Sequence, residues 1–141
     1  LPKFKEYDII DTDYLFGILN KQVQFELQPE VNITEIIYPG AGPHTDLWQT
    51  AINFYFDIGD DETFFWKEIN QTDSKKGLVS YDPKNLEQIG YFKANKGDCY
   101  LLDVGNSIHS VKMNKPAIRR ILRLYWQELS FDQVLQGLKY L

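Results

Sequence analysis

The chain contains two histidines, and both lie at positions where they could ligate a metal. Asp46 follows His44 by two residues, and His109 lies far along the chain in a β-like segment. In an extended segment residues i and i+2 project to the same face, so the His44 imidazole and the Asp46 carboxylate can converge. An opposing strand could bring His109 to the same pocket. Two imidazoles and one carboxylate on one face of a metal are typical of mononuclear non-haem Fe(II) oxygenases.

Each of these residues also has a purely structural interpretation. His44 and Asp46 can form a local hydrogen-bonded pair that stabilises a loop, and His109 alone can be a core or turn histidine. Metal ligation is favoured because the three occur together, in the order that a facial triad requires, and an arginine follows them.

Two arginines, Arg119 and Arg120, open the last predicted strand after His109. Alternate residues of that strand form two faces, and the face with Arg120 is the more apolar, so we expect Arg120 to point into the interior. A buried guanidinium needs an anion, and its fork suits a ligand carboxylate. The alternatives are a buried ion pair with a protein carboxylate such as Asp103, or Arg119 in the binding role, because a register inferred from sequence slips easily.

Two polar residues give weaker signals around the same pocket. Asn53 lies in a β-like run, where a buried polar side chain must find partners, and it could bind a cosubstrate. Tyr38 precedes a glycine loop and could donate its hydroxyl to a cosubstrate carboxylate, as could Tyr100. For Asn53 and Tyr38 a structural role is at least as well supported.

The elements that must position these residues are mostly short strands separated by turn residues. Asp11–Asp13 precedes a short helix, and Ser130–Gln133 forms a capping box that predicts a last helix through Leu141. The segment Pro39–Pro43 is expected not to lie in a strand. Eight strands are predicted: Val31–Tyr38, Trp48–Ile58, Glu62–Ile69, Gly77–Tyr81, Glu87–Lys93, Cys99–Val104, Ser107–Met113 and Ile118–Leu129. This pattern predicts an all-β jelly roll with minor helices, in one domain over residues 1–141 whose core spans about 31–129.

Composition excludes several classes of function. The 141 residues suit one domain, and a net charge of −5 disfavours binding to nucleic acid or to an anionic membrane. No apolar run is long enough to cross a bilayer.

The lone Cys99, expected to be buried, indicates a reducing compartment, so we expect a cytoplasmic protein. The first residue is Leu1, which suggests a trimmed N-terminus, and the C-terminal helix would allow a homodimer.

The chain resembles the Fe(II)/2-oxoglutarate-dependent oxygenases, in particular their prolyl-hydroxylase-like members. The resemblance covers about residues 33–126 and rests on His44-x-Asp46, on Gly97–Asp103, and on His109–Val111 followed by Arg120–Leu122. It implies a double-stranded β-helix, Fe(II) held by His44, Asp46 and His109, and 2-oxoglutarate chelating the metal with its distal carboxylate on Arg120. The chain is shorter than larger members of the family, and Glu62–Trp66 replaces a glycine-rich stretch.

The expected function is therefore a dioxygenase that uses Fe(II), 2-oxoglutarate and dioxygen to hydroxylate a peptide, an amino acid or another small polar substrate. One alternative is a cupin-like metal-binding protein that does not use 2-oxoglutarate. The other is a non-catalytic jelly-roll module for assembly or recognition, because one architecture hosts many functions.

Overall fold

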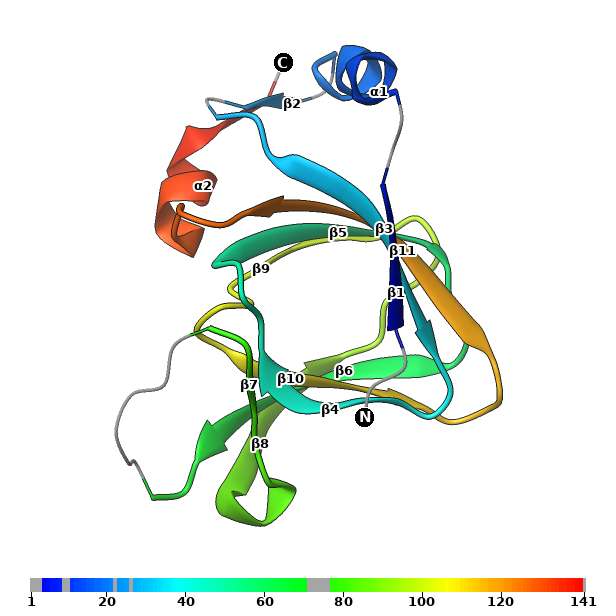
Figure 1. Cartoon of the computed structure of the whole chain (residues 1–141), viewed down its shortest axis with the longest axis vertical. Coiled ribbons are helices and arrows are strands. Elements are labelled where there is room, and N and C mark those ends of the chain that lie inside the picture. The colour runs from blue at the N-terminus through cyan, green and yellow to red at the C-terminus, as the bar shows by residue number, and fades with distance from the viewer. Residues whose placement is uncertain (1–3, 9–10, 22, 26, 71–76, 141) are drawn as a thin grey trace.

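Two five-stranded antiparallel sheets form the two layers of the fold in a computed structural model of the chain (Figure 1). The structure describes residues 4–8, 11–21, 23–25, 27–70 and 77–140. In order across the sheet, the major sheet contains β1 (Phe4–Asp8), β3 (Glu30–Ile37), β11 (Ile118–Trp126), β5 (Thr50–Asp57) and β9 (Cys99–Leu102). The minor sheet contains β7 (Val79–Ser80), β4 (Gly40–Thr45), β10 (Ile108–Met113), β6 (Asp61–Glu68) and β8 (Leu86–Phe92).

Smaller elements lie outside these two layers. They are helix α1 (Thr12–Leu19), the short 3₁₀ helix η1 (Pro83–Asn85), helix α2 (Phe131–Gly137), and a two-stranded ribbon of β2 (Val23–Phe25) and β12 (Leu138–Tyr140). Among the described residues, no helix is both long enough and apolar enough to cross a bilayer.

The connections follow the pattern of a jelly roll. From β3 to β6, and again from β8 to β11, successive strands alternate between the major and the minor sheet. This alternation brings strands that are distant in sequence side by side, such as β4 and β10, which carry the two histidines. The all-β jelly-roll prediction is confirmed, and all eight predicted strands are present with small shifts of their ends.

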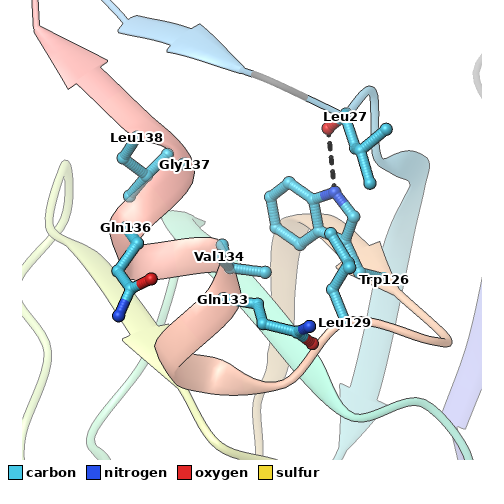
Figure 2. Close-up of a pocket in the computed structure, with 8 residues that line it drawn as sticks. All are labelled: Leu27, Trp126, Leu129, Gln133, Val134, Gln136, Gly137 and Leu138. Carbon is cyan, nitrogen blue, oxygen red and sulfur yellow. Dashed lines mark hydrogen bonds between the residues drawn. The ribbon is translucent and has the colours of Figure 1, made fainter.

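Apolar residues cover both faces of the major sheet. Between the sheets, Ala51 and Leu102 pack with Phe65 and Phe92 of the minor sheet. On the outer face, Ile52, Leu124 and Trp126 pack under Val134 of α2. Figure 2 shows the hollow beside this helix, where the Trp126 indole donates a hydrogen bond to the Leu27 carbonyl at 2.9 Å. Because α2 needs an apolar surface beneath it, the outer face of β11 is as apolar as a core face.

Two predictions about secondary structure are wrong. The segment Pro39–Pro43 was expected to break the sheet, but Gly40–Thr45 forms β4. The ladder between β4 and β10 shifts register between His44 and Ala41, so Pro43 lies at an irregularity where no ladder hydrogen bond from its nitrogen is needed. The last helix ends at Gly137, and the chain continues as β12 instead of remaining helical to Leu141, which itself lies outside the described residues.

Two other differences concern the major sheet. The polar N-terminal segment adds β1 as an edge strand beside β3, which extends the sheet beyond the predicted core. Cys99, expected to be a buried apolar residue, is exposed at the start of β9.

Gly40 is the residue on which the start of β4 depends. Its φ is +115°, and a Cβ there would lie 2.1 Å from the Val111 carbonyl oxygen of β10. Only glycine tolerates both the dihedral and the close approach. Glycine at this position therefore allows the close approach of β4 and β10, the strands that carry the two histidines.

We predict that Gly40→Ala lowers the free energy of unfolding by about 2 kcal/mol or more, because it adds backbone strain and a clash with β10. Gly42→Ala is the matched control in the same strand, since its Cβ would have no heavy atom within 4 Å. Urea denaturation of both variants measures the effect. Equal stability of the two variants would contradict this account.

Candidate metal centre

The structure brings His44, Asp46 and His109 together. His44 in β4 and His109 in β10 are direct partners across the antiparallel ladder, and so their side chains share a face. Asp46 follows the end of β4. The Asp46 Oδ1 atom lies 3.2 Å from His44 Nε2 and 3.7 Å from His109 Nε2. One ligand atom from each of the three residues lies within 4.8 Å of the others, a spacing that fits a shared cation.

Backbone carbonyls fix the orientation of both imidazoles. His44 Nδ1 donates to the Gly42 carbonyl and His109 Nδ1 to the Ser107 carbonyl, each at 2.7 Å. A carbonyl oxygen can only accept, so each Nδ1 carries a proton, and each Nε2 faces Asp46 with a lone pair when its ring is neutral or with an N–H when its ring is protonated. Lone pairs and a carboxylate that face one another need a proton or a metal ion between them. Metal-ligating histidines characteristically donate their other ring N–H in this way.

The two histidines have different pKa values, because burial dominates at His109 and hydrogen bonds dominate at His44. It lowers the pKa of His109 to about 4, despite the nearby Asp46 charge. Burial acts in the same direction on His44, but the hydrogen bonds with Asp46 and Gly42 outweigh it and raise the pKa of His44. Burial alone would raise the pKa of Asp46, and the contact with His44 and the charges nearby instead lower it. At neutral pH His109 is therefore neutral and Asp46 is ionised, which are the forms that bind a metal.

The site is enclosed but not sealed from solvent. The side chains of Asp46 and His109 are 9% and 11% exposed, whereas that of His44 is 21% exposed and gives the site its contact with water. The hollow beside α2 does not contribute, because it lies against the outer-face residues Trp126 and Val134 of the major sheet.

The positive charge of Arg123 in β11 acts on all three candidate metal ligands, His44, Asp46 and His109. Electrostatically it lowers the pKa of Asp46 and of both histidines. Its guanidinium carbon lies 5.2 Å from the centre of the Trp48 ring, a cation–π contact. Trp48 in turn packs on Tyr125, with ring centres 4.7 Å apart.

A second interior cation, Arg119, is already paired. Arg119 Nε lies 3.2 Å from Asp61 Oδ2, and both side chains are 3% exposed. The N–H does not point at the carboxylate oxygen, so the contact is an ion pair without a hydrogen bond. The Arg119 guanidinium also lies over the Tyr55 ring, 5.1 Å from its centre.

The prediction that Arg120 faces the interior is wrong. Its side chain is 40% exposed, and it pairs on the outer face with Glu35 at 2.9 Å and with Asp57 at 2.5 Å. The two faces of β11 were grouped correctly, but the more apolar one packs under α2 and the face with Arg119 and Arg123 points between the sheets. The predicted cosubstrate role of Arg120 therefore loses its structural basis, and the alternative partner Asp103 is not its counterion.

The structure places the two weaker candidates, Asn53 and Tyr38, in different environments. Asn53 is buried and faces the interior, where its Nδ2 donates to the Tyr55 hydroxyl at 3.4 Å. Tyr38 is exposed at the turn between β3 and β4, at the end of β4 opposite His44, and is not brought to the metal centre. A binding role for Asn53 stays a prediction.

Sequence reasoning missed Arg123 and Trp48 as site residues. The spacing of these two residues from other site residues is the signal that could have identified them. Arg123 is on the same strand face as Arg119, and Trp48 follows Asp46 by two residues, as Asp46 follows His44.

Comparisons with known proteins give structural matches only. No family model matches the chain, and neither does any curated protein sequence. The structure of E. coli ycfD is similar with a TM-score of 0.56 and 15% identity, over 89% of this chain and 32% of that one. The chain thus spans about a third of the length of that protein. At this identity the likeness supports the fold alone.

Two dioxygenase structures match more weakly. Hydroquinone 1,2-dioxygenase PnpCD in complex with Cd2+ and 4-hydroxybenzonitrile has a TM-score of 0.47 and 16% identity, over 74% of this chain and 64% of that one. Hydroquinone 1,2-dioxygenase from Sphingomonas sp. TTNP3 with 4-hydroxybenzoate bound has a TM-score of 0.46 and 16% identity, over 74% and 66%. TM-scores this low carry no conclusion about chemistry.

We predict that the two histidines of the metal-free protein titrate far apart. His44 should protonate with a midpoint above 6.5 and His109 only below pH 5, as followed by ¹H–¹⁵N NMR of the imidazoles in the presence of a chelator. Asp46→Asn should lower the midpoint of His44, because burial then acts without the carboxylate. Two overlapping titrations near pH 6.5 would contradict the described geometry.

Proposed function

We propose that this chain is a mononuclear non-haem Fe(II) oxygenase with His44, Asp46 and His109 as the metal ligands. The observation that carries the proposal is the convergence of three ligand atoms within 4.8 Å, with both Nδ1–H groups held by backbone carbonyls. Two nitrogens and one carboxylate oxygen on one side of an ion are the ligand set of Fe(II) oxygenases. Bound Fe(II) would supply dioxygen activation and oxidation of a substrate C–H bond.

The residues of the chain contribute orientation and partial exclusion of water. The carbonyls of Gly42 and Ser107 hold the imidazole planes, and Asp46 supplies the negative charge that a divalent ion needs. Aromatic side chains, including Trp48 and Phe65, pack in the interior against Ala51, Leu102 and Val104, and Phe65 is the direct partner of His109 in the minor sheet. An apolar enclosure of this kind protects a reactive oxidant from water.

Use of 2-oxoglutarate is the finer part of the proposal. It is supported by the interior face of β11, where Arg123 provides positive charge that suits an anionic cosubstrate and where the predicted alternative Arg119 also lies. The ion pair of Arg119 with Asp61 favours the alternative, a cupin-like metal protein in which this charge is balanced internally. We propose a peptide, an amino acid or another small polar molecule as the substrate class.

We predict that the protein binds one Fe(II) per chain and that His109→Ala lowers the affinity by roughly 100-fold or more, because loss of outer-shell partners alone costs about 10–100-fold. Anaerobic equilibrium titration measures this, and Arg120→Gln, on the outer face, is the control that should bind like wild type. Adding 2-oxoglutarate should then produce a weak visible charge-transfer band.

The two alternatives give different results in the same experiment. Metal binding without a band on addition of 2-oxoglutarate would identify the cupin-like protein that does not use this cosubstrate. Absence of stoichiometric metal in wild type, or equal affinity in His109→Ala, would contradict the oxygenase proposal and leave the non-catalytic jelly-roll module.

A further inference from the structure

The outer face of the minor sheet is not covered by an α-helix in the described part of the chain. Along β10, Val111 and Met113 pack toward the interior with Ile36 of the major sheet, so Ser110 and Lys112 point to the opposite side. Figure 1 shows α1 and α2 on the side of the major sheet, away from this face. The outer face of the minor sheet is also the face opposite to that of the two histidines, and so it is separate from the candidate metal centre.

A row of aromatic side chains lies on this outer face. Phe64 of β6 is the direct partner of Ser110 in β10 and of Tyr91 in β8, so the three residues share the face. The Phe64 ring centre lies 5.9 Å from that of Tyr91 and 6.3 Å from that of Trp66, with interplanar angles of 30° and 43°. Tyr91 is 62% exposed. A contiguous exposed patch of this kind is typical of a binding surface.

A groove of about 410 Å³ lies beside the aromatic row. Phe64, Trp66 and Gln88 line it from β6 and β8, and Pro39–Pro43 of β4 line it across β10. The glycines of β4 contribute to this space, since a Cβ at Gly42 would have no heavy atom within 4 Å. The volume falls in the range of small-molecule sites, about 300–1,000 Å³, and the groove has a rigid aromatic wall.

The polar groups of the groove can bind a ligand that both donates and accepts hydrogen bonds. The Trp66 indole donates to Ser110 Oγ at 2.8 Å, which fixes the plane of the ring and leaves the hydroxyl proton of Ser110 able to donate. The exposed Gln88 amide offers both donors and an acceptor, and the exposed Lys112 ammonium offers donors. No described carboxylate lines the groove.

These features exclude several classes of ligand. A cation is disfavoured by Lys112 and by the lack of a lining carboxylate, and a nucleic acid is disfavoured by the net charge of −5. A peptide cannot join as an additional strand along the groove, because β10 already pairs with β4 and β6. A sugar ring fits the remaining requirements. Its C–H face packs on the negative face of an aromatic ring, and its hydroxyls donate and accept at the rim.

We propose that the groove on the outer face of the minor sheet is an oligosaccharide-binding site. Trp66 and Phe64 stack on the sugar rings, and Gln88, Ser110 and Lys112 bind the hydroxyls. The site does not depend on a metal, since it lies on the other face of the sheet from the three candidate ligands. Two sources share this chemistry: a neutral oligosaccharide, and one whose sugars carry carboxylates that pair with Lys112.

The three tryptophans allow the site to be located directly. Their indole N–H groups give separate signals in ¹H–¹⁵N NMR, and the probes are cellohexaose, maltohexaose, chitohexaose and hexagalacturonate at millimolar concentrations. We expect at least one probe to shift the Trp66 signal saturably, with or without Fe(II). The signals of Trp48 in the interior and of Trp126 beside α2 are internal controls that should not move.

Two variants test the residues that hold the sugar. Trp66→Ala should weaken binding roughly tenfold, because an aromatic contact contributes about 0.5–1.5 kcal/mol beyond the area that it buries. Its readout is calorimetric titration, since the indole signal is lost. Gln88→Ala, at an exposed position, should keep the wild-type unfolding temperature and weaken binding by about 2- to 10-fold, because it removes a hydrogen bond.

Matched control variants come from other surfaces of the chain. Tyr14→Ala in α1 removes an aromatic ring that is 70% exposed, and Gln136→Ala removes an amide beside the hollow at α2 (Figure 2). Both variants should bind the sugars like wild type. Because Gln88→Ala leaves the core intact, it keeps the test decisive even when Trp66→Ala does not fold.

The outcomes that overturn the proposal are specific. They are no shift of the Trp66 signal with any of the four probes, a shift of the Trp126 signal in its place, or wild-type affinity in Gln88→Ala. Lys112→Gln separates the two sources. Loss of hexagalacturonate binding in this variant, with binding also weakened by Trp66→Ala, identifies an acidic sugar, whereas unchanged binding of a neutral probe identifies a neutral one. Hexagalacturonate binding that needs Lys112 but not Trp66 shows a simple anion contact and overturns the sugar site.

Discussion

The cross-strand pairing of His44 with His109 is the contact on which the rest of the site depends. It directs two Nε2 atoms at one carboxylate oxygen of Asp46, an arrangement that needs a proton or a metal ion between these atoms. The pairing exists because β4 and β10 are neighbours in the minor sheet, and that ladder needs Gly40 at its start and an irregularity at Pro43. The local backbone thus holds the three side chains close together.

The charges inside the sandwich explain why its interior is not its most apolar region. The face of β11 between the sheets includes Arg119 and Arg123, whereas Leu124 and Trp126 lie on the opposite face under α2. A sheet that is covered on both sides can place its apolar residues on the side that only packs, and its polar residues on the side that binds a ligand. In this arrangement α2 packs on the apolar outer face, and the charged residues of β11 lie on the side of the candidate metal centre.

The sequence predicts the strands and the His44–Asp46 convergence because both depend on the two-residue period of an extended chain. It also predicts the start of α2, because the Ser130 capping box is a local hydrogen-bonding pattern. It does not predict which face of β11 is interior, because α2 covers the other face and hydrophobicity then no longer distinguishes them. The sequence also does not predict β4, because the prolines and glycines of this segment disfavour a strand locally. Pro43 fits there because of a register irregularity between β4 and the distant strand β10.

The charges of the site also constrain its ligand. Neutral imidazoles and one ionised Asp46 would leave a bound divalent ion with a net positive charge, and Arg123 adds a second one nearby. Arg119 adds none, because Asp61 balances it. Under the proposed function, these positive charges would favour an anionic ligand over a neutral one. The same accounting disfavours a purely structural metal site, since a metal without an anionic ligand would increase the repulsion that Arg123 already experiences.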